Sequence, residues 1–217
     1  MKYSKLKFLV SLALCFVTHS QAFEVKVKDN AGNPLSNAVV WLEGDLYRPK
    51  AEQVSDMFSM GQKDRAFTPH ILVVPTGAKI EFPNFDSILH HVYSFSKPKP
   101  FELKLYKETP KSEIVFENNG VVELGCNIHD WMLGYILVVD SGYYALTDKQ
   151  GRANIALSPS QIGKAQLHVW HERFEKLEAS EQIEVHLSSH SQKETYKVKQ
   201  SLMEAFDFAV DESDGYE

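Results

Sequence analysis

Short stretches of alternating apolar and polar residues, separated by frequent turn signals, constrain the fold of this chain most. Ala78, Ile80 and Phe82 fall on one face of an extended segment, and charged residues stand between them. A period of two is typical of a strand with one buried face. Gly, Pro, Asn and Asp cluster at residues 29–34, 75–77, 118–120 and 148–151. Many short strands between such turns predict an all-β sandwich or barrel.

A single helix is predicted near the C-terminus. Val198, Leu202, Phe206 and Val210 recur at every fourth residue, which is a helical period. We therefore expect residues 191–217 to form a short C-terminal helix followed by an acidic, solvated tail.

The N-terminus has the three parts of a secretory signal peptide. Three lysines precede an apolar run over residues 8–17, and small residues then stand at the −3 and −1 positions of a cleavage after Ala22. The run is too short to span a bilayer. Cys15 follows Leu14, where lipoprotein processing requires a small residue, so no membrane anchor is predicted. We expect residues 1–22 to be removed and the mature protein to be periplasmic or secreted.

Charge restricts the partners of the mature chain. Removal of residues 1–22 deletes three lysines and no acids, and lowers the formal net charge from −6 to −9. Nucleic acids and anionic membrane surfaces both favour a basic protein surface. The composition therefore argues against either as a partner.

The mature chain keeps one cysteine, Cys126. A single cysteine cannot form a disulfide within the chain, and a free thiol in an oxidising compartment is open to oxidation. Cys126 could be a small buried apolar residue, as many free cysteines are. Its surroundings favour metal ligation instead.

Three potential metal ligands follow one another at intervals of three residues. Cys126, His129 and Met132 stand between two predicted strands, residues 121–126 and 133–139. A thiolate, an imidazole and a weak axial thioether are the ligand types of mononuclear electron-transfer copper. A second imidazole would come from His90 or His91. Side chains alternate across a strand, so only one of the two can reach the metal, and an inward Val92 favours His90.

These motifs resemble those of the cupredoxin (plastocyanin/azurin) superfamily, and the Cys-x-x-His-x-x-Met spacing is that of amicyanin. The resemblance covers about residues 67–140, including Phe82-Pro83-Asn84-Phe85-Asp86 and His90-His91-Val92. The chain is also similar to exported cupredoxin-like proteins often labelled methylamine utilization proteins. The resemblance implies a Greek-key β-sandwich over residues 51–140 that binds one copper per chain through His90, Cys126, His129 and Met132.

One position departs from the family pattern. Many cupredoxins have Asn directly after the first ligand histidine, and this chain has His91 there. Groups around the ligands tune the geometry and potential of a metal site. The departure leaves the copper type and the potential open.

The flanking segments carry a second resemblance. Residues 25–40 and 144–170 are similar to the strands of transthyretin-like or carboxypeptidase-regulatory-like sandwiches. This implies a small sandwich formed by residues 23–50 plus 141–190, with the copper domain inserted in it.

Three functions remain open at this point. The first is one-electron transfer with a transient redox partner protein. The second is a periplasmic copper carrier or buffer without a redox role, and the third is a β-sandwich binding module without metal. The sequence contains no evident nucleophile–base pair and no paired carboxylates around a substrate site, so we do not expect an enzyme.

Overall fold

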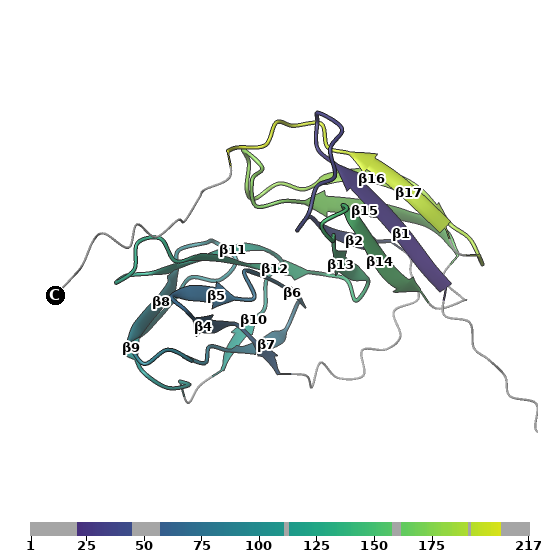
Figure 1. The fold of residues 1–217 in the computed structure, drawn as a ribbon. Coiled ribbons are helices and arrows are strands. Elements are labelled where there is room, and N and C mark those ends of the chain that lie inside the picture. The colour runs from purple at the N-terminus through teal and green to yellow at the C-terminus, as the bar shows by residue number, and fades with distance from the viewer. Residues whose placement is uncertain (1–20, 45–56, 111–112, 158–161, 191, 205–217) are drawn as a thin grey trace, which may run out of the picture.

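The computed structural model describes residues 21–44, 57–110, 113–157, 162–190 and 192–204. Every regular element in these ranges is a strand, which confirms the all-β prediction (Figure 1). The described residues contain no helix long and apolar enough to cross a membrane.

The middle of the chain forms a sandwich around the predicted site. One face is a five-stranded sheet in the order β6-β12-β11-β8-β9, and the other holds a three-stranded sheet, β10-β7-β3, and the hairpin β4-β5. The strands of this site-bearing sandwich are β3 (Phe58–Ser59), β4 (Gly61–Lys63), β5 (Ala66–Thr68), β6 (Ile71–Pro75), β7 (Ala78–Glu81), β8 (His90–Ser94), β9 (Phe101–Tyr106), β10 (Ile114–Phe116), β11 (Gly120–Cys126) and β12 (Leu133–Val139).

The strands near the two ends of the chain assemble into another pair of sheets, which we call the flanking sandwich (Figure 1). One sheet has the order β14-β1-β17 and the other β13-β2-β15-β16, so segments from both ends of the chain alternate in each. The strands are β1 (Gln21–Lys28), β2 (Val39–Glu43), β13 (Tyr144–Leu146), β14 (Arg152–Leu157), β15 (Gly163–Trp170), β16 (Glu181–Leu187) and β17 (Gln192–Lys197).

Strand β12 is buried on both faces, which explains its uninterrupted apolar sequence. Ile136 and Val138 point into the core of the site-bearing sandwich. Tyr135, Leu137 and Val139 belong instead to the core that includes the flanking sandwich. Side chains of β12 thus alternate between the cores of the two sandwiches.

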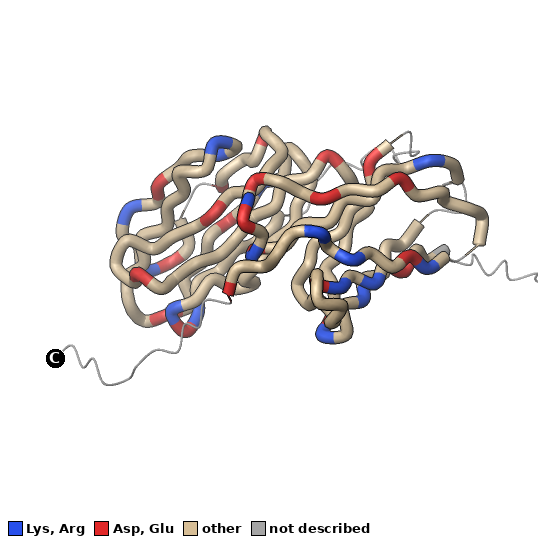
Figure 2. The backbone as a smooth tube through the Cα atoms, turned by 90° about the horizontal axis from the view of Figure 1, so that it is seen from above, with Lys and Arg blue, Asp and Glu red and all other residues tan. Residues whose placement is uncertain are grey.

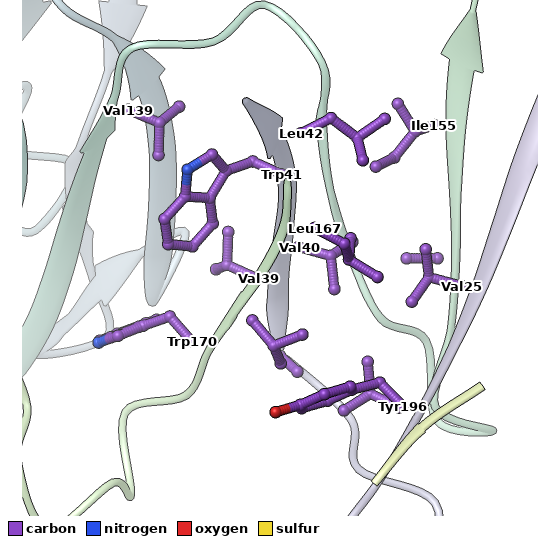
Figure 3. Close-up of a cluster of buried hydrophobic side chains, with 14 of the residues drawn as sticks. Val25, Val39, Val40, Trp41, Leu42, Val139, Ile155, Leu167, Trp170 and Tyr196 are labelled. Atoms are coloured by element: carbon purple, nitrogen blue, oxygen red, sulfur yellow. The ribbon is translucent and has the colours of Figure 1, made fainter. Parts of the chain in front are cut away.

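Two tryptophans of the flanking sandwich cover this outer face of β12. The ring of Trp170 meets that of Tyr135 edge-on, with centroids 5.7 Å apart. In Figure 3 the indole of Trp41 lies next to Val139. Burial of such large apolar rings contributes on the order of 2 kcal/mol each, so the two sandwiches share a stabilising interface.

The predicted C-terminal helix is wrong over the described residues. Gln192–Lys197 is strand β17, which pairs in parallel with β1. Tyr196 and Val198 are both buried, which is the period of two of a strand. The pairing with β1 therefore outweighs the helical period of the sequence. Leu202 forms a bridge with Phe174. Residues 205–217 lie outside the described residues, as do residues 1–20, and the signal peptide stays a prediction.

An ion pair joins the two sandwiches beside this interface. His70, just before β6, is paired through Nε2 with the carboxylate of Glu172, just after β15. The hydrogen bond to Glu172 raises the pKa of His70 above 6.5, against the effect of burial. Burial alone would raise the pKa of Glu172, but His70 lowers it overall, below 4.5.

The pair should therefore stabilise the fold most between about pH 4.5 and 6.5. Its contribution is lost as the pH rises through the raised pKa of His70, and as the pH falls through the lowered pKa of Glu172. We expect His70→Gln to remove less than about 1 kcal/mol near pH 5.5 and almost nothing near pH 9, because solvent screens a half-exposed histidine. Urea unfolding of both proteins at the two pH values measures this, and an equal loss at both would contradict it.

Candidate metal centre

Two neighbouring strands and one short loop position the predicted ligands. Cys126 ends β11 directly opposite Val92 of β8, and His90 begins β8. The register between β8 and β9 shifts between His90 and Val92. Residues 127–132 form the loop to β12, which is tightened by a hydrogen bond from the Met132 backbone N–H to the His129 carbonyl, 2.9 Å.

His90, Cys126 and His129 form a compact cluster that could hold a metal ion. Their ligand atoms all lie within 4.8 Å of one another. The Cys126 Sγ is 3.8 Å from His90 Nδ1 and 3.6 Å from His129 Nδ1. His90 is fully buried and Cys126 is 3% exposed, whereas His129 is only partly buried. Among the described residues this is the one group of His, Cys, Asp or Glu with this geometry.

The donor set fits copper. A thiolate and two imidazoles that converge on one point, with a weak thioether nearby, are the ligands of blue-copper electron-transfer sites. Met132 is buried in the same cluster of apolar residues as Cys126. Its role as the axial ligand stays a prediction.

His91 lies on the opposite side of β8. Its Nε2 is 2.9 Å from Glu102 Oε1 on β9, and its ring meets Tyr93 edge-on at 6.3 Å. The pleat therefore places His90 in the cluster and His91 outside it.

The protonation state of His129 favours metal binding. Burial lowers the pKa of His129 most, and the electrostatic influence of the neighbouring His90 and Arg65 lowers it further. The imidazole is therefore neutral at neutral pH, as a ligand must be.

Solved structures similar to this chain include copper proteins, although no family model and no curated protein matches it. The Cu-containing nitrite reductase of Thermus scotoductus SA-01 is 24% identical, with a TM-score of 0.37, over 39% of this chain and 22% of that one. A purple cupredoxin from Nitrosopumilus maritimus is 24% identical, with a TM-score of 0.33, over 38% of this chain and 98% of that one. Amicyanin from Paracoccus versutus is 15% identical, with a TM-score of 0.33, over 39% and 83%.

These solved structures are what about two fifths of the chain is similar to. Identities and TM-scores this low transfer no activity, substrate or partner from those proteins to this chain. What the centre of this chain can do depends on its own side chains.

Asp86 is a part of the centre that sequence analysis did not predict. Its Oδ2 lies 2.8 Å from Nε2 of His90, the ring nitrogen that faces away from Cys126. The same carboxylate accepts hydrogen bonds from the backbone N–H groups of Asp64 (2.7 Å) and Arg65 (3.0 Å). Both of these residues have left-handed backbone angles, φ 55° and 56°.

These contacts hold Asp86 ionised. Burial alone would raise the pKa of Asp86, but the two backbone N–H groups and the His90 ring lower it below its usual value. A histidine that binds metal through one nitrogen usually donates its other N–H to such an acceptor, which fixes the tautomer and increases the basicity of the ligand. Asp86 would accept the Nε2–H of His90 and so leave Nδ1, the nitrogen nearer to Cys126, available to a metal.

We expect Asp86→Asn to weaken copper binding by about 10- to 100-fold. It should also raise the reduction potential, because a loss of imidazole basicity destabilises Cu(II) more than it destabilises Cu(I). Competition with a copper chelator and a redox titration measure the two effects. Glu102→Gln is the matched control, because it removes the acceptor of the outward-facing His91. Equal effects of the two variants would contradict this role of Asp86.

Proposed function

We propose that this chain is an exported protein that carries one electron at a time on a single type 1-like copper ion. The observation that carries the proposal is the compact cluster of His90, Cys126 and His129, with ligand atoms within 4.8 Å of one another. Ligands fixed by a rigid sandwich reorganise little when the metal changes oxidation state, which favours electron transfer. Met132 would be the weak axial ligand.

The electron would enter and leave through His129. This ligand lies on the loop and is only partly buried, whereas His90 is fully enclosed. The ring of Trp131 lies 5.5 Å from that of His129, and Ile128 beside it is 44% exposed. An exposed apolar patch around a ligand suits brief contact with a partner redox protein.

Burial of two of the three ligands supports electron transfer over catalysis. His90 and Cys126 have almost no exposed surface, which leaves little open access for a substrate at the metal. We also propose that the mature chain begins at Phe23 and acts in the periplasm or outside the cell. The flanking sandwich, which extends beyond the predicted segments 23–50 and 141–190 to include β17, would be a separate domain that carries the copper domain, 51–140.

The test is made on the mature protein, residues 23–217, loaded with Cu(II). We expect an intense visible thiolate band, one copper per chain, and repeated reduction by ascorbate and reoxidation by ferricyanide. We expect no turnover of nitrite, amines or phenols. A copper that exchanges rapidly and cannot be cycled would indicate a carrier of copper, and metal-dependent turnover would indicate an enzyme.

A further inference from the structure

A groove runs along the seam between the two sandwiches and reaches the metal-ligand loop. Its larger part has a volume of about 600 Å³, and its smaller part has a volume of about 230 Å³. The two parts adjoin, since Val121 and Glu178 line both. We call the larger part the seam groove. Its walls come from β8, β11, the ligand loop and, on the flanking sandwich, residues 177 and 178.

The charges lining the seam groove are all negative. Glu123, Asp130 and Glu178 line it and are exposed, and none of them forms a salt bridge within the described part of the chain. No Lys or Arg is among the described residues that line either part. Both signs of charge occur over each sandwich (Figure 2), so the seam groove differs from the surface around it.

Aromatic rings form one wall of the seam groove, close to the thiolate. Tyr93 packs on Phe95 with ring centroids 5.1 Å apart, and Phe95 is 87% exposed. Tyr93 lies directly against Gly125, where an added Cβ would be 2.7 Å from the ring. Gly125 is the covalent neighbour of Cys126. One residue, Gly125, therefore separates the aromatic wall of the groove from the residue that carries the thiolate.

The flanking sandwich fixes the opposite wall. The Nε1 of Trp170, which is packed at the interface with Tyr135, donates a 2.7 Å hydrogen bond to the carbonyl of Leu177. This bond holds the segment that carries Glu178 over the sheet. The groove thus requires both sandwiches.

We propose that the seam groove docks a basic segment of the redox partner, a Lys- or Arg-bearing stretch of protein. The proposal rests on the function proposed above and names the chemistry of the partner. Ammonium or guanidinium groups would meet the three carboxylates and the faces of Tyr93 and Phe95. The exposed apolar side chains of Phe95 and Ile128 at the rim suit a protein surface.

The first arm of the test measures binding without redox chemistry. Hepta-lysine is titrated into the copper-free mature protein at low ionic strength, and amide chemical shifts report where it binds. The groove variant Glu123→Gln/Glu178→Gln is compared with Glu108→Gln/Glu204→Gln, which makes the same change in net charge at exposed residues outside the groove. We expect about a tenfold loss of affinity in the groove variant and less than about twofold in the control.

The second arm measures electron transfer. The Cu(I) protein is mixed with ferric cytochrome c from horse heart, a lysine-rich one-electron protein, and with ferricyanide, a small anion. We expect the groove variant to slow the reaction with cytochrome c about tenfold, with a weaker dependence on salt, and not to slow the reaction with ferricyanide. Its visible spectrum should match that of the unmodified protein.

Two results would overturn the proposal. Equal losses in the groove and control variants would show attraction by net charge alone. Binding of butylamine as tight as that of hepta-lysine would show a site for small amines in place of a protein. If the protein does not hold or cycle copper, the proposed function fails, and the hepta-lysine arm still decides whether the groove docks a basic segment.

Discussion

The Cys126→Ser variant is expected to lose the intense visible absorption of the copper-loaded protein completely. That band arises from charge transfer between the thiolate and Cu(II), and a serine hydroxyl is too hard a donor to replace it. Sγ of Cys126 lies 3.6 Å from Nδ1 of His129 and 3.8 Å from Nδ1 of His90. Cys126 is the one cysteine of the mature chain, and a methionine thioether cannot form a thiolate. Serine is close to cysteine in size and should leave the sandwich folded.

Visible and EPR spectra of the Cu(II) forms measure the effect. Met132→Leu is the informative companion, because it keeps the thiolate and removes the weak ligand. We expect this variant to remain coloured with a higher reduction potential. If Cys126→Ser kept its colour, the thiolate would not be a ligand and the cluster would have been misassigned.

The arrangement of the central strands could be predicted because it depends on local pattern. Pleating forces neighbouring residues to opposite faces, so the choice of an inward Val92 already separated His90 from His91. The spacing of Cys126 and His129 in one short loop likewise places two ligands together without any long-range contact. These features needed only the positions of the strands.

Asp86 and β17 could not be predicted in the same way, because long-range contacts decide both. Nothing near Asp86 in sequence shows that a left-handed turn at Asp64 and Arg65 will donate two N–H groups to its carboxylate. Its position four residues before His90 was the available signal. Likewise Gln192–Lys197 becomes a strand because β1, at the other end of the chain, offers an edge for parallel pairing.

The seam between the sandwiches could not be predicted either, because it also depends on long-range contacts. The sequence of β12 shows a continuous apolar run, but only the folded chain shows that half of that run covers the core of the flanking sandwich. The interface that buries Trp170 also positions the wall of the seam groove through Leu177. Stability and partner docking are therefore coupled at this seam.

The second large effect is expected for His90→Ala. This change removes a fully buried ligand and leaves the Asp86 carboxylate without the ring that it contacts at 2.8 Å. We expect loss of the type 1-like spectrum and a fall in the free energy of unfolding of about 1–3 kcal/mol, since a buried polar group loses its partner. The copper-free protein should show the same loss of stability, because Asp86 and the cavity do not depend on the metal.

His91→Ala is the matched control for this prediction. Its ring points to Glu102 on the outer side of β8, so the variant should bind copper and stay coloured. Chelator competition, visible spectra and urea unfolding of the two variants separate the roles of the neighbouring histidines. If His91→Ala lost the colour and His90→Ala kept it, the register of β8 would be displaced by one residue, and every side chain of that strand would face the other way.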